Sequence, residues 1–517
     1  MERFSLNAAR RSRELDSLSS LSGPVDVLVI GGGVTGAGVA LDAATRGLSV
    51  VLAEKHDLAF GTSRWSSKLV HGGLRYLASG QVGIAHESAV ERGILIGYTA
   101  PHLVRPFPQI VPLHRSVNTA NALTVRAGLV AGDALRAAAH TSARTLPRSR
   151  RISTAEVTRY APTVLARGLR GGLMGWDGQL NDDARLVVSL ARTAAGYGAR
   201  ILTRVTASEV TGSGAVLTDT LTGSRFDVSA RLVINAAGVW AGELAPGLAL
   251  RPSRGTHLVF SQKSFGGLNA GLMVPVPGRV GRFVFALPVP DNRVYVGLTD
   301  EDAPGPIPDE PRAAESEIAF LLSTINRALA VPLTRADVLG SYSGLRPLLD
   351  AGSGSTADIS RKHQVLCGAD GLITVVGGKL TTYRRMAEDA LDAGLARVGS
   401  SGSGLSGSGV AAGPCRTRRL PLVGAAGAVE LSAVPAPERL VRRYGTEAAR
   451  VCAVGGPELN CPISPATEVT RAELVFGVRH EGALDVADLL DRRTRIGLDP
   501  AARATAERAA EDALADR

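Results

Sequence analysis

A glycine-rich motif near the start of the chain has the residue types and spacing of a dinucleotide-binding turn. Gly31, Gly33 and Gly36 form G-x-G-x-x-G, in which the first glycine permits a tight turn and the second lets the backbone approach a pyrophosphate. The third allows a helix to pack closely on a strand. Glu54 ends the next apolar segment and can accept hydrogen bonds from ribose hydroxyls. The motif therefore predicts a dinucleotide site.

A second glycine-rich turn, far along the chain, could serve the same cofactor. Gly377, Gly378 and Lys379 begin an expected helix over 379–396. The N-terminus of that helix could face the pyrimidine edge of a flavin, where the reduced ring carries negative charge that a helix dipole stabilises. A buried strand also ends in small residues at Gly238, which lets backbone pass close to a cofactor. The first motif does not separate FAD from NAD, but its place near the N-terminus favours a tightly held flavin, so we predict FAD.

The elements that must position these residues follow from the apolar pattern. Residues 25–30 predict a buried strand, 37–46 a helix and 48–53 a second strand, which together make a βαβ unit. The alternating pattern in 255–300 indicates a mixed or antiparallel sheet distinct from this parallel core. Further elements are predicted as a helix at 184–195 and as strands at 199–206, 214–220, 224–229, 232–235 and 372–376.

Five segments carry unusual strings of residues. They are 67–76 (SKLVHGGLRY), 182–186 (DDARL), 235–240 (NAAGVW), 342–347 (YSGLRP) and 377–384 (GGKLTTYR). In this order they closely resemble the FAD-dependent (aerobic, respiratory) glycerol-3-phosphate dehydrogenases. The resemblance runs from about residue 24 to 395 and continues more loosely through 471–498.

The resemblance implies an α/β fold with a glutathione-reductase-like, Rossmann-type FAD-binding domain built from separated segments. A mixed-sheet substrate domain would cover the flavin, and a helical C-terminal cap domain would follow. The expected boundaries are a mobile leader at 1–23, the FAD-binding domain at 24–100, 181–255 and 340–396, the substrate domain at 101–180 and 256–339, a Gly/Ser linker at 397–414, and the helical C-terminal domain at 415–517.

The same resemblance implies a reaction, the oxidation of sn-glycerol 3-phosphate to dihydroxyacetone phosphate with hydride transfer to flavin N5 and electrons passed to membrane quinone. The substrate is a dianion with a secondary alcohol, so its site must hold a phosphate and stabilise a developing alkoxide. Arginine suits the phosphate because its planar guanidinium donates two parallel hydrogen bonds. By resemblance, the residues near the substrate are Arg75, Tyr76, Arg346, Arg361, Lys379 and Thr381.

Three residues are candidates for the catalytic steps. Arg346 is best cast as the cation that stabilises the alkoxide, because a guanidinium stays protonated in proteins. His257 matches a family histidine at the flavin face and is the more natural acid–base group, since the pKa of an imidazole lies near neutrality. Lys379 could be the base if desolvation lowered its pKa, or it could simply bind phosphate.

Cofactor contacts are also expected from the loop at 60–67. Ser63 and Ser67 are the residues of this loop that we predict to lie beside FAD. Arg64 and Trp65 stand in the same loop, where the family often has small residues.

The charge balance bears on partners. Lys and Arg total 58 and Asp and Glu 48, a net charge of +10. This excess is compatible with arginine-rich coding bias or with a basic surface for anionic lipid or nucleic acid. Aromatic residues are only 4% of the chain and the arginines are dispersed, so a nucleic-acid partner is not expected. The alternatives kept open are a related flavin oxidase of glycerol 3-phosphate or an amino acid that uses O₂, and an FAD-containing nucleic-acid-binding protein.

The remaining expectations concern location. Four scattered cysteines without a C-x-x-C pair favour a reduced cytoplasmic compartment and no metal site. No apolar run has the length of a membrane span, so any attachment to the inner face of the cytoplasmic membrane would be peripheral. Amphipathic stretches in 471–517 or the arginine-rich leader could supply it. A homodimer is compatible with the sequence.

Overall fold

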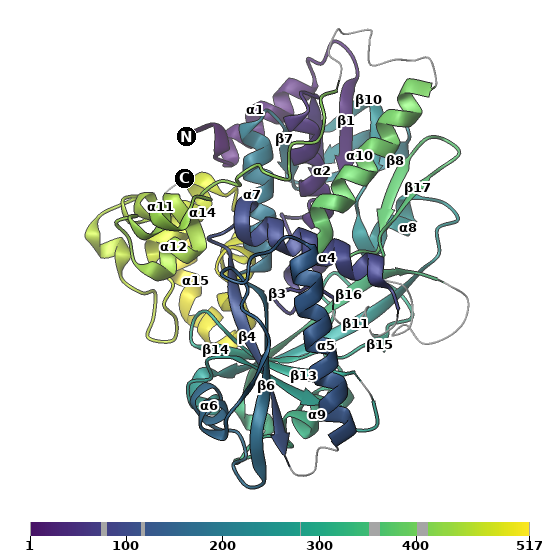
Figure 1. The fold of residues 1–517 in the computed structure, drawn as a ribbon. Helices are drawn as coiled ribbons and strands as arrows, with labels where there is room; N and C mark the ends of the chain where they lie inside the picture. The colour runs from purple at the N-terminus through teal and green to yellow at the C-terminus, as the bar shows by residue number, and fades with distance from the viewer. Residues whose placement is uncertain are drawn as a thin grey trace.

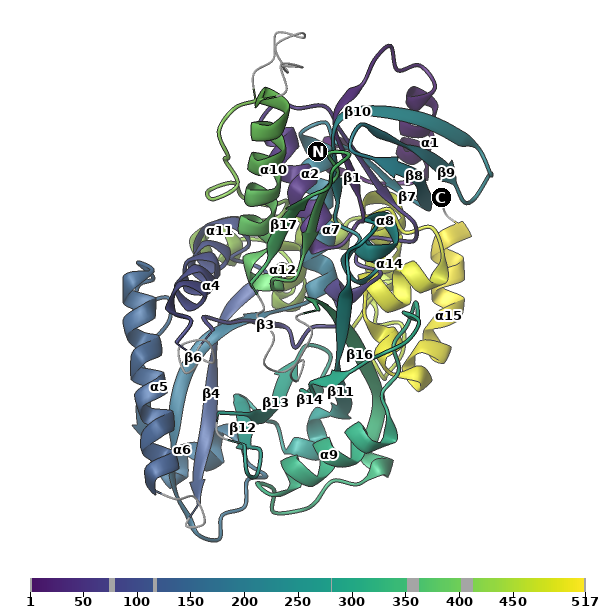
Figure 2. The same cartoon turned by 90° about the vertical axis from the view of Figure 1, so that its right-hand side faces the viewer.

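The computed structural model describes residues 2–73, 80–114, 119–279, 281–350, 362–400 and 412–515. In these residues, two β-sheets lie one above the other along the molecule, and a helical domain packs against their side (Figures 1 and 2). None of the described helices combines the length and the apolar character needed to cross a bilayer.

The first sheet carries the predicted βαβ unit. Its strands run in the order β17-β18-β10-β1-β2-β7, with β8 and β9 continuing from β10. The central pairs are parallel, and β1 is buried almost throughout because helices or strands cover both of its faces. The strand bounds are β1 Val25–Ile30, β2 Val50–Glu54, β7 Arg200–Thr203, β8 Val205–Thr211, β9 Gly214–Asp219, β10 Arg225–Asn235, β17 Gln364–Cys367 and β18 Ile373–Val376.

Three helices cover one face of this sheet. They are α2 (Val34–Thr45), α7 (Asp183–Gly196) and α10 (Tyr383–Ser400), and they share one core with the inner residues of the strands. The Asp182 side chain caps α7 by accepting from the backbone amides of its first turn. This arrangement is the Rossmann-type layer that the sequence predicts.

The opposite face of the sheet is covered in part by the N-terminal segment. Residues Ala8–Leu18 form α1, and its Leu15 and Leu18 are buried against strands of the first sheet. Arg10 donates a hydrogen bond to the carbonyl of Ala195, and Arg11 forms an ion pair with Asp219. The prediction of a mobile leader is therefore wrong, because the segment contributes apolar side chains to a core that its own sequence cannot reveal.

The second sheet has ten strands among the described residues, in the order β15-β11-β14-β13-β12-β4-β6-β3, with β16 beside β11 and β5 beside β6. It is mixed, since β12 pairs with β4 in parallel and most other neighbours are antiparallel. The bounds are β3 Leu69–Val70, β4 Val104–His114, β5 Arg150–Ile152, β6 Leu169–Leu180, β11 Leu250–Ser261, β12 Gly271–Pro275, β13 Phe283–Val289, β14 Arg293–Gly297, β15 Glu301–Asp302 and β16 Val338–Leu349.

The predicted boundary between the two sheet domains needs correction. β16 pairs with β11 along most of its length, from Leu250 opposite Leu349 to Leu258 opposite Ser341. Residues 340–349 and 250–255 therefore belong to the second sheet, although we expected them in the FAD-binding domain. The pairing joins segments about ninety residues apart, and a strand's own pattern does not identify its partner.

Helices border the second sheet and connect it to the first. α9 buries Ile318 and Leu321 in the core of the second sheet, and α5 lies along the sheet's outer side (Figure 2). α4 packs beside α5 and beside the turn that precedes α10. The bounds of these and the two short helices are α4 Val82–Ile94, α5 Thr119–Ala138, α6 Thr154–Tyr160, α8 Ala241–Leu244 and α9 Glu315–Asn326.

The C-terminal domain is helical, as predicted. Its α-helices are α11 Ala428–Ser432, α12 Glu438–Tyr444, α13 Ala448–Cys452, α14 Arg471–His480 and α15 Pro500–Ala515. They enclose their own apolar clusters and pack against α7 and the N-terminal segment (Figure 1). The predicted linker begins too early, because α10 continues through residues 397–400, and most of the remaining linker lies outside the described residues.

Candidate active site

A cavity of about 1530 Å³ is lined by residues of both sheets. It begins at the glycine-rich turn after β1 and extends across the second sheet as far as α5. Its volume exceeds the roughly 300–1,000 Å³ of an ordinary small-molecule pocket. The cavity therefore has room for a dinucleotide together with a second ligand.

The glycine-rich turn forms one end of this cavity. Gly31 has a φ of +108°, and a Cβ there would lie 2.6 Å from the carbonyl oxygen of Ala236. A Cβ on Gly36 would lie 1.9 Å from the carbonyl oxygen of Gly31, so this glycine allows α2 to approach β1. Gly31 and Gly33 line the cavity whereas Gly36 does not. Gly31 thus forms the tight turn and Gly36 the close helix–strand contact that their spacing predicts, and Gly33 lies on the cavity wall.

The N-terminus of α2 supplies hydrogen-bond donors at this end. Gly33 is the N-cap residue and has no side chain to satisfy the first amides of the helix. Ser63 Oγ accepts a hydrogen bond from the Val34 amide at 2.9 Å and itself lines the cavity. Free amides of a helix N-terminus beside a hydroxyl are suited to phosphate oxygens. These residues fit the pyrophosphate of FAD.

Glu54 stands where β2 ends, against the glycine-rich turn. Its Oε2 accepts from the Gly32 amide at 2.6 Å and its Oε1 from the His56 amide at 2.8 Å. Burial raises the pKa of Glu54, while these two amides act in the opposite direction. The carboxylate thus braces the turn and also lines the cavity, where ribose hydroxyls of the cofactor can reach it.

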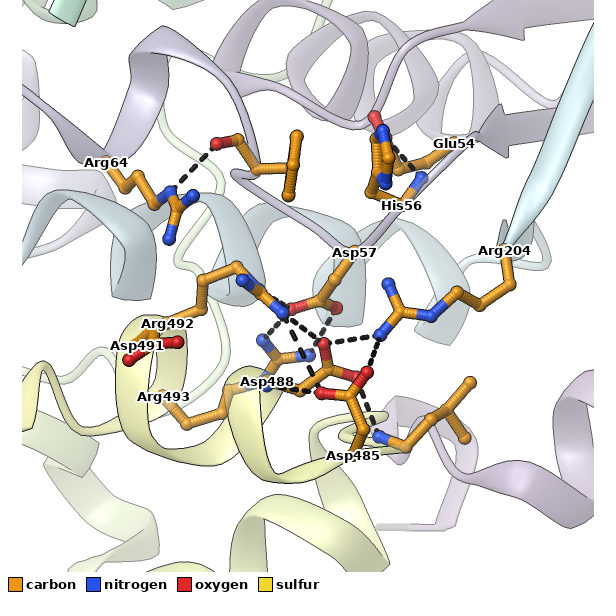
Figure 3. Close-up of polar contacts among 12 residues, drawn as sticks. Glu54, His56, Asp57, Arg64, Arg204, Asp485, Asp488, Asp491, Arg492 and Arg493 are labelled. Carbon is orange, nitrogen blue, oxygen red and sulfur yellow. Dashed lines mark hydrogen bonds and ion pairs between the residues drawn. The ribbon is translucent and has the colours of Figure 1, made fainter. Parts of the chain in front are cut away.

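The C-terminal domain holds the turn that follows Glu54 (Figure 3). Asp57 is fully buried and accepts from Arg492 Nε at 2.6 Å and from Arg493 Nη1 at 2.7 Å and Nη2 at 2.9 Å. Burial by itself would raise the pKa of Asp57, but the two guanidinium groups hold it well below its usual value. Arg204 Nη2 donates to Asp488 Oδ1 at 2.8 Å in the same cluster. The C-terminal domain is in this way joined to the ribose side of the cavity.

The second predicted glycine turn also reaches the cavity. Gly378 has a φ of +77°, and a Cβ there would lie 2.4 Å from Met386 Sδ. Lys379 precedes a 3₁₀ turn at Leu380–Thr382 that leads into α10, so the expected helix begins later than predicted. Lys379 Nζ donates to Ser88 Oγ of α4 at 2.8 Å. A cation is thereby held at the junction of α4 and α10.

Arg346 reaches the cavity from β16. Its Nη1 donates to Ser253 Oγ at 3.0 Å and to Asp300 Oδ1 at 3.2 Å. A Cβ on Gly255 would lie 2.2 Å from Arg346 Nη2, so the missing side chain of this glycine makes room for the guanidinium. Nη2 also donates to the carbonyl of Thr299 at 3.3 Å. These contacts orient a cation that lines the cavity.

His257 differs from its prediction. The residue is 1% exposed, does not line the cavity, and stacks on Tyr342 with ring centroids 4.7 Å apart. Burial, with smaller contributions from Lys68 and Arg346, lowers the pKa of His257 to about 3. The expectation of a pKa near neutrality is therefore wrong. His257 Nε2 lies 2.9 Å from Ser67 Oγ, and Ser67 does line the cavity.

A buried ion pair supports this region, and sequence reasoning missed it. Lys68 Nζ donates to Asp183 Oδ2 at 2.7 Å, and both side chains are almost completely buried. Burial lowers the pKa of Lys68 to about 8, although Asp183 acts against that shift. Ser66 Oγ also donates to Asp183 Oδ2. The signal was present, because the two residues belong to two of the five unusual segments, but nothing in the sequence shows that those segments touch.

A second buried ion pair, between Arg92 and Asp177, also lies at the cavity wall. Arg92 of α4 donates through Nη1 to Asp177 Oδ1 at 2.6 Å, and the Gly72 amide donates to the same oxygen at 3.1 Å. A Cβ on Gly72 would lie 2.7 Å from Arg92 Nη1. Asp177 lines the cavity and was not among the predicted residues.

Most of the predicted site residues meet at the cavity. Those that line it are Gly31, Gly33, Glu54, Ser63, Ser67, Gly238, Arg346, Gly378, Lys379 and Thr381. Gly36 and His257 lie behind its wall. Arg75, Tyr76 and Arg361 lie outside the described residues.

Comparison with known proteins identifies the family. The family described as FAD dependent oxidoreductase matches residues 26–384. Glycerol-3-phosphate dehydrogenase 1 of Mycobacterium tuberculosis is 59% identical over 503 residues, which cover 96% of this chain and 95% of that protein. The chain belongs to the FAD-dependent glycerol-3-phosphate dehydrogenase family. The resemblance stated from the five segments and the prediction of FAD are thereby confirmed.

Three further matches concern the C-terminal domain and the fold. The family described as C-terminal domain of alpha-glycerophosphate oxidase matches residues 415–516 of this dehydrogenase-family chain. The crystal structure of the glycerol-3-phosphate dehydrogenase from Bacillus halodurans complexed with FAD has a TM-score of 0.72 at 26% identity, covering 99% of this chain and 94% of that one. L-alpha-glycerophosphate oxidase from Mycoplasma pneumoniae, with a TM-score of 0.54 and 18% identity over 71% of this chain and 94% of that one, shares the fold.

Proposed function

We propose that this protein oxidises sn-glycerol 3-phosphate to dihydroxyacetone phosphate with FAD and passes the electrons to a membrane quinone. The observation that carries the proposal is the continuity of the cavity, which joins the dinucleotide turn to the cations Arg346 and Lys379. The 59% identity to a protein named glycerol-3-phosphate dehydrogenase 1 supports the choice of substrate.

Arg346 and Lys379 are the two cations of the cavity wall that we propose to face the substrate phosphate. Arg346 is held by Ser253, Asp300 and the carbonyl of Thr299, so its guanidinium need not be reoriented when a dianion binds. Lys379 approaches the cavity from the other side, tied to Ser88. We place the substrate between these two cations, where one can bind phosphate and the other can stabilise the alkoxide that develops at the secondary alcohol.

The chain's own residues also supply a route for the alcohol proton. FAD, when bound, supplies the acceptor for the two electrons of the substrate C–H bond. Ser67 Oγ lines the cavity and is hydrogen-bonded to His257 Nε2. Because burial lowers the pKa of His257 to about 3, this imidazole is a weak proton acceptor. In our proposal His257 therefore orients Ser67, and Lys379 is the candidate base.

The acceptor has two candidates. A membrane quinone is our first choice, with the protein peripheral on the inner face of the cytoplasmic membrane, and the net charge of +10 supports contact with anionic lipid. The match of residues 415–516 to a domain named after alpha-glycerophosphate oxidase favours O₂ as the second candidate.

Anaerobic titration of the purified flavoprotein tests both steps. We expect glycerol 3-phosphate to bleach the flavin absorbance, while glycerol at the same concentration leaves it unchanged because glycerol lacks the phosphate. Equal bleaching by both compounds, or by neither, would contradict the substrate assignment. The bleached protein is then mixed with either a water-soluble quinone or air-saturated buffer. Reoxidation by quinone at a much higher rate supports the dehydrogenase, and rapid reoxidation by O₂ with stoichiometric hydrogen peroxide supports the oxidase.

A further inference from the structure

Helix α5 presents an apolar stripe to solvent. Among residues 122–138, the exposed side chains include Leu123, Ala127, Val130, Ala134 and Ala137, which recur every three or four residues along one face. Leu123 is 65% exposed and Val130 is 49% exposed. The helix lies on the outer side of the second sheet, away from the C-terminal domain (Figure 2). A surface helix ordinarily turns such a stripe toward the protein core.

The ionisable side chains of α5 point the other way. Within 122–138 they are Arg126, Asp133 and Arg136. Arg126 Nη1 donates to Ser149 Oγ at 2.8 Å, and Asp133 Oδ2 accepts from the same hydroxyl at 2.6 Å. Arg136 is buried and donates to the carbonyl of Thr141. None of the ionisable side chains of 122–138 is therefore among the exposed ones, so the stripe carries no charge.

The segment that runs beside α5 is basic. Ser149 contacts two residues of α5, so the chain before β5 lies along one flank of the helix. Residues 134–155 contain no Asp or Glu. The exposed arginines of this flank are Arg144, Arg148, Arg150 and Arg151, of which Arg150 forms an ion pair with Glu156. An apolar helix face bordered by exposed arginines is the composition of a surface that binds anionic lipid.

The inner face of the same helix reaches the active-site cavity. Ala122, Val125 and Leu129 of α5 line it, together with Met273 and Phe283 of the neighbouring strands. This part of the cavity lies at the end opposite the glycine-rich turn and is mainly apolar. The exposed stripe and the apolar end of the cavity are therefore two sides of one helix.

We propose that the exposed stripe of α5 and its arginine flank are the surface by which this protein docks on an anionic lipid bilayer. The inference deepens the proposed function and rests on it in one respect. Docking at α5 would bring the apolar end of the cavity to the bilayer, which holds the proposed quinone acceptor. The segments expected from the sequence fit this role less well. Helix α1 packs Leu15 and Leu18 on the first sheet, and α14 is buried. Helix α15 turns its apolar residues into the C-terminal domain, and its exposed face carries Glu507, Glu511 and Asp512. A second copy of the chain on this face would bring like-charged flanks together, which opposes self-association.

Sedimentation with lipid vesicles tests the surface. The flavin-loaded full chain is mixed with vesicles of phosphatidylcholine alone or of phosphatidylcholine with phosphatidylglycerol. We expect binding to the second kind, weakened by salt, and at least about tenfold weaker partitioning for Leu123→Glu/Val130→Glu and for Arg144→Gln/Arg148→Gln. The matched control is Leu221→Glu/Val429→Glu, because these side chains are 59% and 85% exposed in other regions. The control should bind vesicles like the unchanged protein.

The other outcomes overturn the proposal. Equal vesicle binding by the α5 variants and the control would place the lipid contact elsewhere. A change from dimer to monomer in Leu123→Glu/Val130→Glu, with vesicle binding unaltered, would show that a second copy covers the stripe. Flavin content and oxidation of glycerol 3-phosphate with a soluble dye, which should be unchanged in all variants, report folding. Because vesicle binding is measured without substrate, failure of the substrate assignment would be seen separately.

Discussion

The two ends of the active-site cavity are built differently. At the dinucleotide end, the cavity wall presents backbone amides, glycines and one carboxylate. Its main residues, Gly31, Gly33 and Glu54, belong to a single βαβ unit. At the end where we propose that the substrate binds, the polar groups are long side chains such as Arg346 and Lys379, carried by elements far apart in the chain. Backbone contacts leave almost no freedom for adjustment, whereas a long side chain can be replaced without moving the fold. Changes at the first end should therefore affect flavin retention, and changes at the second should affect substrate selection.

The largest effect on flavin retention is expected from Gly36→Ala. The new Cβ would lie 1.9 Å from a backbone oxygen, so α2 must move from β1 and the turn between them must open. We expect at least about a tenfold loss of FAD affinity, measured by flavin retention on dialysis, since overpacking of this kind costs about 1–3 kcal/mol. Gly83→Ala is the matched control, because a Cβ there meets nothing within 4 Å. Full flavin retention in Gly36→Ala would show that the dinucleotide end can adjust to an added side chain, contrary to our description.

Asp57→Asn should rank second in its effect on flavin retention, and its main effect should be on stability. It removes the charge that Arg492 and Arg493 share. Arg492 keeps its ion pair with Asp488, whereas Arg493 exchanges a charged acceptor for a neutral one and keeps its hydrogen bonds to the carbonyl of Glu481. We expect a loss of about 3–5 kcal/mol in the free energy of unfolding, together with weaker FAD binding, because the turn after Glu54 loses its anchor. Denaturant unfolding measures the first and flavin titration the second.

The control for Asp57→Asn is Asp512→Asn, which breaks an exposed pair with Arg508 and should change stability by less than about 1 kcal/mol. Equal losses of stability from the two substitutions would show that the buried cluster contributes no more to folding than an exposed ion pair. The direction in which stability changes with pH is a second check on this buried cluster. Because the pKa of Asp57 is lowered by folding, its contribution is present above the ordinary aspartate pKa and is lost as the pH falls below it.

Arg346→Gln probes the substrate end and should leave the flavin in place. We expect the KM for glycerol 3-phosphate to rise about a hundredfold and the preference over glycerol to shrink, because a charge-assisted contact to the phosphate or alkoxide contributes roughly 2–3 kcal/mol. Steady-state kinetics with both substrates measures the effect. Arg335→Gln, in a pair whose side chains are 58% and 79% exposed, is the control. Loss of flavin in Arg346→Gln would erase the distinction between the two ends.

The smallest effect is expected at His257. Folding lowers its pKa to about 3, so between pH 7 and 5 the unfolded chain binds a proton that the folded protein refuses. The buried imidazole should therefore cost about 2 kcal/mol of stability on going from pH 7 to pH 5, and His257→Gln should lose correspondingly less. The kcat of the unchanged enzyme should show no inflection near pH 6.5 from this group. Such an inflection, abolished in His257→Gln, would show that His257 titrates as an exposed imidazole.

The sequence predicts the dinucleotide end well because its determinants are local. The apolar run, the glycine spacing and the acid after the second strand all lie within one supersecondary unit, and each is tied to a backbone conformation. The structure changes only the bounds of these elements. The same reasoning placed Arg346 and Lys379 near the substrate through the family resemblance, and the described residues bring both to the cavity wall.

Long-range contacts were beyond that reasoning. The burial of His257 depends on Tyr342 and on a Cβ-free position at Gly297 opposite its ring. The order in α1 depends on an apolar surface of the first sheet, and the pairing of β16 with β11 crosses the predicted domain boundary. A residue's type restricts what it can do, but its pKa and exposure depend on neighbours that arrive from distant segments.

By itself, the sequence determined the family, the FAD-binding turn and the residue types of a phosphate site, because these follow from short motifs with fixed backbone requirements. The tertiary structure decided which charges are buried and which face solvent. The same arginine-rich chain places Arg493 against Asp57 in a closed cluster and leaves Arg148 exposed beside an apolar helix face. Composition records only that both residues are arginine, whereas the free energy of a charge depends on its distance from water and from its counter-charge.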